Sequence, residues 1–195
     1  MLDFFIEIDR ELFLFLNGLN NGLFDFLMYW VSNRFIWIPL YLWIAYLAYS
    51  QGGWRGLLTV LILVGVLITL SDRGSVFIKD LTTRSRPCVE LPALGYNVHI
   101  VRDKCIQHWG FVSSHATNTF ALATLVVMLL GRKNRFVVPV MFGYAALNSY
   151  SRVYLGLHYP GDIFFGALFG VVLGLLVFFL WRKLSHCVAS FAKNQ

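Results

Sequence analysis

Residues 162–181, "DIFFGALFGVVLGLLVFFLW", contain no charged residue after Asp162. As a helix, this stretch is long enough to cross the hydrocarbon core of a bilayer, which is about 30 Å thick. Of the 195 residues of the chain, 58% are hydrophobic, whereas soluble domains are usually about 45–50% apolar. Because the excess is gathered in long blocks, the sequence predicts an all-α, polytopic membrane helical bundle.

Four more apolar blocks precede residues 162–181. They are residues 35–50, 56–71, 116–131 and 136–151. The helix of the second block is expected to continue toward Lys79. The chain is thus expected to contain about five transmembrane helices.

The first 33 residues are also apolar, but acidic residues and the run "NGLNNG" (17–22) interrupt them. This pattern favours two short helices in the membrane interface over a clean span. The chain is predicted to form a single domain. Its parts are interfacial helices at 1–33, a transmembrane bundle at 34–182 with a polar outer loop at 80–112, and a cytoplasmic tail at 183–195.

The charged residues are divided unequally between the two predicted ends of the bundle. The short connections at one end and the C-terminal tail contain basic residues and no acid: Arg55, Arg132, Lys133, Arg135, Arg182, Lys183 and Lys193. Short basic loops mark the cytoplasmic side of a membrane protein. The loop 80–112 is thus expected to face the periplasm or cell exterior, outside an inner (cytoplasmic) membrane. The net charge of +6 forms no soluble basic face, so no nucleic-acid partner is expected.

Three polar clusters lie on the predicted outer side. They are "KDLTTRSRP" (79–87), "VSSHATN" (112–118) and "SRVYLGLHYPGD" (151–162). Each has an ordinary explanation by itself, because cations bind lipid headgroups, a serine caps a helix, and an arginine near a span end extends to the interface. Together, however, they bring several cations to one place, and such a group needs an anion. Arginine suits phosphate because its planar fork donates to two oxygens, and a helix start adds N–H donors.

His158 and Asp162, in the third cluster, indicate catalysis. Pro160 fits the first turn of a helix, so Asp162 is expected in that turn and His158 just before it. The carboxylate could bind one ring nitrogen and fix the tautomer, which would leave the other nitrogen free to attack phosphorus. His115, on a different helix, could protonate the departing alkoxide. Two histidines beside clustered cations predict phosphoryl transfer.

The three clusters resemble the motifs of the type-2 phosphatidic acid phosphatase superfamily, which includes lipid phosphate phosphatases and vanadium haloperoxidases. The family pattern is Lys-x6-Arg-Pro, then Pro-Ser-Gly-His, then Ser-Arg-x5-His-x3-Asp. The first and third motifs are matched fully, by Lys79, Arg86, Pro87, Ser151, Arg152, His158 and Asp162.

The second motif is matched in part. Ser113 and His115 agree with it, whereas Val112 replaces the proline and Ser114 replaces the glycine. Glycine lets the backbone approach a ligand closely, and Ser114 keeps the N–H group but could shift the loop. The replacements therefore bear on rate or substrate range more than on the reaction.

The resemblance implies a phosphohistidine intermediate on His158, oriented by Asp162, with His115 as the acid and then as the base. It implies that the phosphate oxygens are held by Lys79, Arg86, Ser113, Ser114 and Arg152. It also implies that no metal or other cofactor is required, and the sequence contains no residues at zinc-ligand spacing. Family members often have six spans, one more than is predicted here.

Two features of the loop 80–112 leave alternatives open. Arg84 could contact the headgroup beyond the phosphate, or it could belong to a solvated surface. Cys88 and Cys105 could form a disulfide if the loop faces an oxidising compartment, and the cross-link would stabilise the fold by roughly 3 kcal/mol. They could equally remain free thiols.

The function that fits these features is a lipid phosphatase whose substrate tails stay in the bilayer. Candidate substrates are phosphatidylglycerol phosphate, phosphatidic acid, undecaprenyl pyrophosphate and lipid A. A non-catalytic anionic-lipid-binding or transport protein would need the cations but has no use for the pair of His158 and Asp162. A phosphotransferase of the same superfamily would share the first half-reaction. The expected partners are the lipid phosphate and membrane lipids, with no obligate protein partner.

Overall fold

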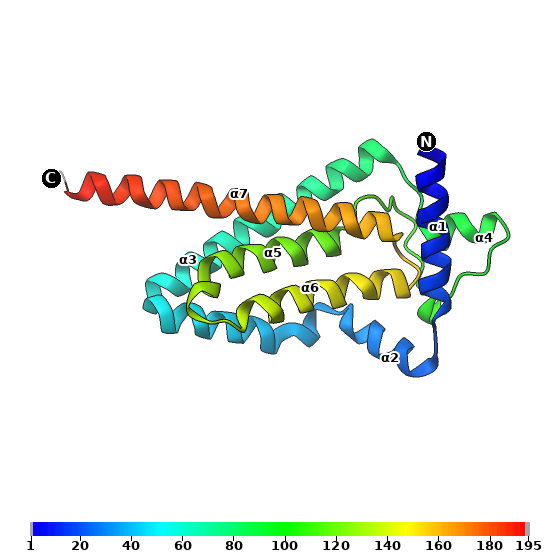
Figure 1. Cartoon of the computed structure of the whole chain (residues 1–195), viewed down its shortest axis with the longest axis horizontal. Coiled ribbons are helices and arrows are strands. Elements are labelled where there is room, and N and C mark those ends of the chain that lie inside the picture. Colours follow the sequence, from blue (N-terminus) through cyan, green and yellow to red (C-terminus); the bar gives the residue numbers. More distant parts are fainter. Residues whose placement is uncertain (1, 194–195) are drawn as a thin grey trace.

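The computed structural model describes residues 2–193, with side chains described for residues 4–102 and 104–185. In that part of the chain the regular elements are helices (Figure 1). In chain order they are α1 (Leu2–Gly18), α2 (Gly22–Val31), η1 (Arg34–Trp37), α3 (Ile38–Thr82), α4 (Pro87–Ala93), η2 (Val101–Asp103), α5 (Ser114–Leu130), η3 (Gly131–Lys133), α6 (Val137–Tyr154) and α7 (Pro160–Lys193). The all-α prediction is confirmed for the described residues.

Three of the helical stretches are long and apolar enough to cross a membrane: Arg34–Ala93, Ser114–Lys133 and Pro160–Ser185. The first of them is not one straight rod, because Gly53 has φ 58° and ψ −153° inside α3. A side chain would strain this backbone conformation, and glycine adopts it freely. The chain reverses there, so α3 consists of two antiparallel arms (Figure 1). With α5, α6 and α7, they make a bundle of five helical segments.

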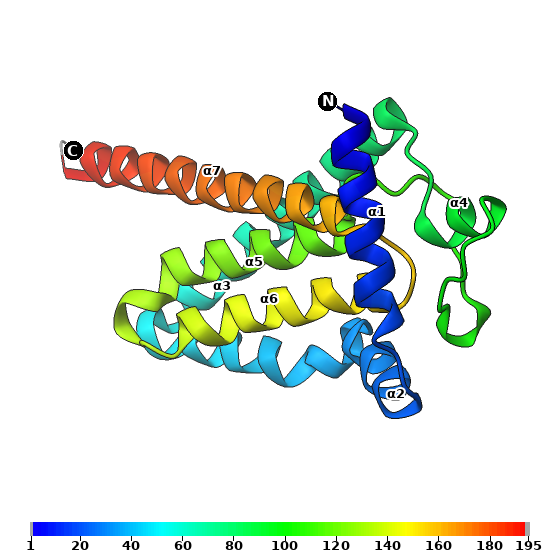
Figure 2. The same ribbon diagram turned by 45° about the vertical axis from the view of Figure 1, so that its right-hand side comes forward.

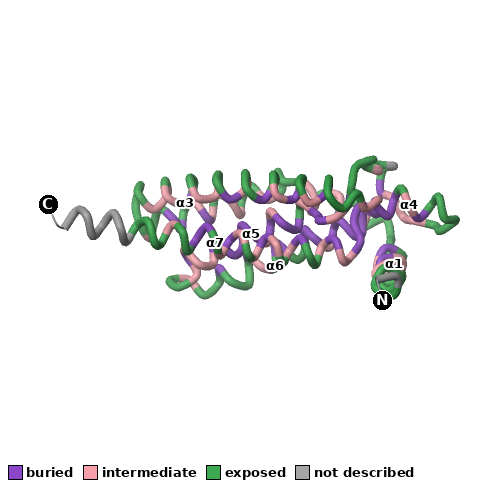
Figure 3. Tube along the Cα trace, turned by 90° about the horizontal axis from the view of Figure 1, so that it is seen from above, coloured by how far each residue is buried: buried purple, intermediate pink, exposed green. Residues whose placement is uncertain are grey.

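The outer surface of the bundle is apolar, as in a helix bundle surrounded by lipid. Side chains such as Leu42, Leu61, Phe77, Phe164 and Leu184 are more than half exposed. Buried residues lie along the inside of the bundle and exposed ones along its outside (Figure 3). Water would disfavour such a surface, whereas lipid tails do not.

Helix α5 lies in the middle of the bundle, in contact with α3, α6 and α7. Glycines on α7 allow the close approach of α5. A Cβ atom added at Gly166 or Gly174 would lie 2.8 Å from the carbonyl oxygen of Ser113 or Ala121, and one at Gly170 would collide with the carbonyl oxygen of Thr117. Small residues at every fourth position permit tight helix packing in membranes. The start of α5 is thereby held against the start of α7.

The N-terminal helices cover one end of the bundle, and α1 runs across it (Figure 2). Asn17, which is 2% exposed, connects α1 to two other segments. Its Nδ2 atom donates to the carbonyl oxygens of His99 (3.0 Å) and Tyr154 (2.9 Å), and its Oδ1 atom accepts from the N–H of His99 (2.8 Å). The two short N-terminal helices were expected; that they lie in the membrane interface stays a prediction.

The predicted loop 80–112 is more structured than its polar composition suggested. Helix α3 continues into it as far as Thr82, and α4 occupies Pro87–Ala93. A disulfide joins Cys88 of α4 to Cys105, with the two Cα atoms 5.8 Å apart.

The C-terminal tail also differs from the expectation. Helix α7 runs on to Lys193 instead of ending near residue 181, so most of the expected tail is helical. The side chains of Cys187 and Lys193 and residues 194–195 lie outside the described part of the chain.

Candidate active site

The three sequence clusters meet at the end of the bundle that α1 covers. Each site residue sits where a helix begins or ends: Lys79 in the last turn of α3, Arg86 at the N-cap of α4, Ser113 at the N-cap of α5, Arg152 in the last turn of α6, and Asp162 in the first turn of α7. His158 lies in the connection between α6 and α7. All of these side chains are buried, at 7% exposure or less.

His158 lies between a cation and a carboxylate. Its Nε2 atom is 2.9 Å from Nη1 of Arg86, and its Nδ1 atom is 3.4 Å from Oδ2 of Asp162. A guanidinium can only donate, so Nε2 is the acceptor and the ring proton is on Nδ1, facing the carboxylate. Asp162 Oδ2 also accepts from the N–H of Tyr159 at 3.0 Å. The tautomer therefore has a lone pair on Nε2.

The charge state of His158 follows from its surroundings. Burial lowers the pKa of His158 well below the ordinary value of 6.5, and the charges of Arg86, Arg152 and Lys79 lower it further. The imidazole is consequently neutral at neutral pH. Arg86 contacts the ring directly; Lys79, Arg86 and Arg152 are called the cation cluster below.

The protein holds the cation cluster in place through neutral oxygen atoms. Arg86 donates from Nε to the carbonyl oxygen of His108 (2.7 Å) and from Nη1 to that of Leu157 (3.1 Å). Lys79 donates to the carbonyl oxygen of Val112 and to Ser114 Oγ, and Arg152 donates to Ser32 Oγ.

The cation cluster has no carboxylate hydrogen-bonded to it among the described residues, and Arg152 Nε is buried without a hydrogen-bond partner there. A buried, unpaired donor is costly. The arrangement suits a bound anion.

The N-terminus of α5 adds backbone donors to this arrangement. Ser113 Oγ caps the helix by accepting from the N–H of Ala116 at 3.5 Å, and Ser114 Oγ is 2.8 Å from Ser75 Oγ. Ser113 and Ser114 were expected to hold the phosphate, the latter with its N–H group kept. The Ser113 hydroxyl caps α5 and the Ser114 hydroxyl accepts from Lys79, and phosphate binding by the two residues stays a prediction. What this segment presents to an anion is the set of N–H groups of its first turn, which have no partner inside the helix.

For Arg84 the sequence left a headgroup contact and a solvated surface open, and the structure shows ion pairs with two carboxylates. Its Nη1 atom is 2.9 Å from Oδ1 of Asp162, and its Nη2 atom is 2.7 Å from Oδ2 of Asp9. The guanidinium also stacks over the ring of Tyr159, with 4.3 Å from Cζ to the ring centroid. The reason is electrostatic: Asp162 is fully buried, and a buried carboxylate needs a paired cation.

Asp9, on α1, was not among the predicted site residues. Besides binding Arg84, it accepts from the N–H of Gly161 at 2.6 Å through Oδ1. It therefore holds both the arginine that supports Asp162 and the first turn of α7. No sequence signal singled it out, because Asp9 is one of four acidic residues in α1.

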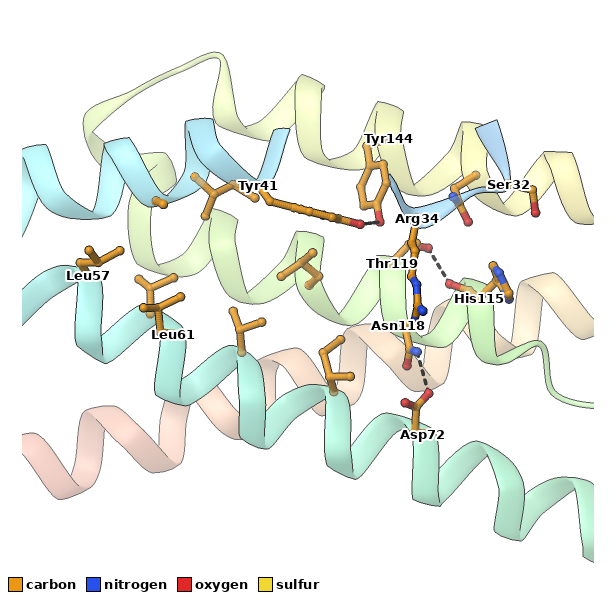
Figure 4. Close-up of a pocket in the computed structure, with 17 residues that line it drawn as sticks. Ser32, Arg34, Tyr41, Leu57, Leu61, Asp72, His115, Asn118, Thr119 and Tyr144 are labelled. Carbon is orange, nitrogen blue, oxygen red and sulfur yellow. Dashed lines mark hydrogen bonds between the residues drawn. The ribbon is translucent and has the colours of Figure 1, made fainter. Parts of the chain in front are cut away.

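A cavity of about 500 Å³ opens beside His115 (Figure 4). It lies between the two arms of α3, α5 and α6. His115, Asn118 and Asp72 line one end, and apolar residues including Leu57 and Leu61 line the other (Figure 4). The His115 side chain is exposed to this space.

Comparison with known proteins places the chain in a family. Residues 53–185 match the model of the PAP2 superfamily. The chain is 33% identical over 186 residues to a lipid A 4'-phosphatase of Bacteroides thetaiotaomicron, covering 95% of this chain and 82% of that protein. It is 30% identical over 179 residues to a lipid A 4'-phosphatase of Porphyromonas gingivalis, covering 91% and 74%.

Two solved structures share the fold. The crystal structure of Aquifex aeolicus LpxE superposes with a TM-score of 0.61 at 22% identity, over 86% of this chain and 93% of that one. A PAP2-type phosphatidylglycerolphosphate phosphatase from Bacillus subtilis superposes with a TM-score of 0.67 at 20% identity, over 91% and 86%. The motifs, the buried histidine with its cations and these relationships agree with one another. The chain belongs to the PAP2 superfamily and is a membrane lipid phosphatase.

Proposed function

We propose that the protein hydrolyses a phosphate ester of a membrane lipid in two steps, through a phosphohistidine on His158. The observation that carries this proposal is the position of the Nε2 lone pair. It belongs to a neutral, oriented imidazole and points at a donor of the cation cluster, where a phosphoryl group would be held. The same side chains that bind the anion thus surround the nucleophile.

In the first step, the phosphate replaces His158 Nε2 as the acceptor for Arg86 Nη1 and also receives hydrogen bonds from Lys79, Arg152 and the start of α5. The Nε2 lone pair then attacks phosphorus, and the bond from phosphorus to the lipid oxygen breaks. The Nδ1 proton stays directed at Asp162, whose negative charge stabilises the ring as it becomes cationic. His115 donates a proton to the departing lipid oxygen, which leaves as an alcohol.

In the second step, His115 is neutral and accepts a proton from a water molecule. The water oxygen attacks phosphorus, and the bond between phosphorus and Nε2 breaks. The electron pair returns to Nε2, inorganic phosphate is released, and His115 again carries the proton that it needs as an acid. The cation cluster stabilises the charge on the phosphoryl oxygens in both steps.

Among the four candidate substrates, the relatives favour lipid A, because the two curated proteins that align with more than 90% of this chain are lipid A 4'-phosphatases. We propose a phosphorylated glycolipid of this kind as the substrate. The apolar cavity beside His115 supports a lipid substrate, since a volume of about 500 Å³ can take part of an acyl chain.

We further propose that residues 1–195 act as one domain in an inner membrane, with α1 and α2 in the interface and the active site facing outward. The bend within α3 and the connection between α5 and α6 lie at the end of the bundle opposite to the site (Figure 1). These two segments contain Arg55, Arg132, Lys133 and Arg135, which supports a cytoplasmic position for this end. The disulfide between Cys88 and Cys105 supports an oxidising compartment on the site's side.

The test uses purified protein and a lipid with a radiolabelled phosphate. Rapid quenching should trap label on the wild-type protein, stable to base and labile to acid as a phosphohistidine is. The His158→Gln variant should form no labelled protein and release no phosphate, while inorganic phosphate still binds. His108→Gln is the matched control, because its exposed side chain is not part of the site. Full turnover by His158→Gln would overturn the proposed mechanism.

A further inference from the structure

We propose that the disulfide between Cys88 and Cys105 positions Arg86 for phosphate binding, so that phosphatase activity depends on this bond being intact. The two cysteines are positioning residues in this proposal, because they act on the phosphate through Arg86. The inference rests on the proposed function, which makes Arg86 a ligand of the phosphate.

The disulfide completes a closed path through the protein that begins and ends at Arg86. Arg86 is the N-cap of α4, and Cys88 lies in the first turn of that helix. The disulfide joins this turn to Cys105, with the two Cα atoms 5.8 Å apart. Three residues after Cys105, the carbonyl oxygen of His108 accepts from Nε of Arg86 at 2.7 Å. The bond therefore connects the helix that begins at Arg86 with the segment that supplies its acceptor.

The Cys88 end of the disulfide is fixed relative to the nucleophile by contacts of its own. The N–H of Cys88 donates to the carbonyl oxygen of Gly156 at 3.1 Å, in the connection between α6 and α7 that also contains the nucleophile. The Cys88 side chain is buried, in one hydrophobic cluster with Leu155 and Leu157 of that connection. The disulfide thus transmits a position from α4 to Cys105.

The carbonyl oxygen of His108 is held by two attachments of the chain around it. Before it, the disulfide fixes Cys105, and after it, the N–H of Gly110 donates to the carbonyl oxygen of Arg84 at 2.7 Å. The exposed residues 106–109 connect these two points. Among the described residues, their backbone groups form no hydrogen bond with the backbone of another element. Without the disulfide one attachment is lost, so the segment gains conformational freedom.

Arg86 needs this acceptor to keep its orientation. Its Nη1 atom donates to the carbonyl oxygen of Leu157 at 3.1 Å and lies 2.9 Å from Nε2 of His158. The bond from Nε to His108 holds a second point of the planar guanidinium, and the two points together fix its plane. Arg86 is only 6% exposed, so water does not readily replace a lost acceptor. A displaced carbonyl oxygen would let the guanidinium turn away from the place where the phosphate is held.

The experiment compares oxidised and reduced wild-type protein in the release of labelled phosphate from a lipid, with unlabelled inorganic phosphate as the inhibitor. A dithiol reductant converts the disulfide to two thiols and is itself oxidised to a cyclic disulfide. Alkylation followed by mass measurement counts the new thiols. Reduction should raise the inhibition constant of phosphate about tenfold, as expected when a hydrogen bond of a charged group is lost, and kcat should fall. Reoxidation with oxidised glutathione should restore both values.

The inhibition constant separates positioning from a purely structural role, because it does not depend on the fraction of the protein that is folded. The double variant Cys88→Ser with Cys105→Ser should have the constant of the reduced wild type and should not respond to the reductant. Ile106→Ser is the matched control, since it places a serine beside Cys105 at an exposed side chain and keeps the disulfide. This variant should behave as the oxidised wild type does. The double variant decides the matter if the disulfide resists reduction, and the reduced wild type decides it if the double variant does not fold.

An inhibition constant within about twofold of the oxidised wild type, in fully reduced protein or in the double variant, would overturn the inference even if stability fell. Arg86→Gln distinguishes this outcome from a failure of the proposed function. It should raise the inhibition constant at least as much as reduction does and should lower kcat. Wild-type turnover and inhibition in Arg86→Gln would instead overturn the proposed binding of phosphate by Arg86, and the inference with it.

Discussion

Arg84 should affect catalysis by positioning Asp162 rather than by binding substrate. The substitution Arg84→Ala removes the 2.9 Å ion pair to Asp162 and the 2.7 Å ion pair to Asp9. Asp162 would be left fully buried with only the N–H of Tyr159 and the ring of His158 as hydrogen-bond donors. Its carboxylate could then turn away from His158, and the imidazole would lose its orientation.

The magnitude can be worked from the burial of the partners. Removing one partner of a fully buried ion pair costs about 3–5 kcal/mol. The Arg84 side chain is 24% exposed, so in the variant water can partly solvate the carboxylates that lose it. The expected cost of removing Arg84 is therefore lower, about 2 kcal/mol. If that free energy falls on the transition state, kcat/KM drops about 30-fold, at about 1.4 kcal/mol for each factor of ten.

The assay is phosphate release with a parallel measurement of inhibition by vanadate or inorganic phosphate. Because Arg84 is outside the cation cluster, kcat should fall while the inhibition constant stays within about twofold. Arg84→Lys, which keeps a cation for one carboxylate, should recover part of the rate. Arg10→Ala is the control, since Arg10 pairs with the exposed Glu7 on α1. Weakened inhibitor binding with an unchanged kcat would refute this reasoning and restore the headgroup role that the sequence suggested.

Three further results are expected. Asp9→Asn should lower kcat about tenfold, less than Arg84→Ala does, because Arg84 keeps Asp162 as a partner. The assay is phosphate release, and an unaltered rate would contradict a role for Asp9. Gly170→Leu should lower the thermal unfolding midpoint of the purified protein by several degrees. Overpacking costs about 1–3 kcal/mol, and even a Cβ atom at residue 170 would collide with Thr117 of α5. An unchanged midpoint would mean that α5 and α7 do not pack this closely. His158 should make stability pH-dependent: its pKa is lowered in the folded state, so below about pH 6.5 the unfolded chain binds a proton that the folded chain does not. The midpoint of the wild type should therefore fall more between about pH 7 and about pH 5 than that of His158→Gln, and parallel curves would argue against a neutral, buried His158.

The sequence was sufficient for the bundle and for the residues of the three motifs. Long uncharged blocks have few alternatives to a membrane helix, and the break between the blocks 35–50 and 56–71 contains the reversal between the arms of α3. The spacing of His158 and Asp162 across the start of a helix brings their side chains to one face, which is why a local motif predicted that the two side chains interact.

Contacts between helices could not be predicted in the same way. Arg84 lies two residues from Arg86 in sequence, but the direction of its side chain is determined by Asp9 and Asp162, which are far away along the chain. The pairing of Asp72 with Asn118 likewise depends on the relative rotation of α3 and α5. Hydrophobic periodicity determines which face of a helix is buried, and it carries no information on which polar groups meet across an interface.

The hydrogen bonds of Asp9 have a practical consequence for truncated or chimeric proteins. The match to the family model begins at residue 53, and all three motifs follow it. A fragment cut at that boundary, or a chimera that exchanged the first helix for an unrelated anchor, would keep every motif residue. It would nevertheless lack the carboxylate that binds Arg84 and the N–H of Gly161. A boundary drawn by homology alone would therefore yield a protein that keeps His158 and Asp162 but loses part of what positions them.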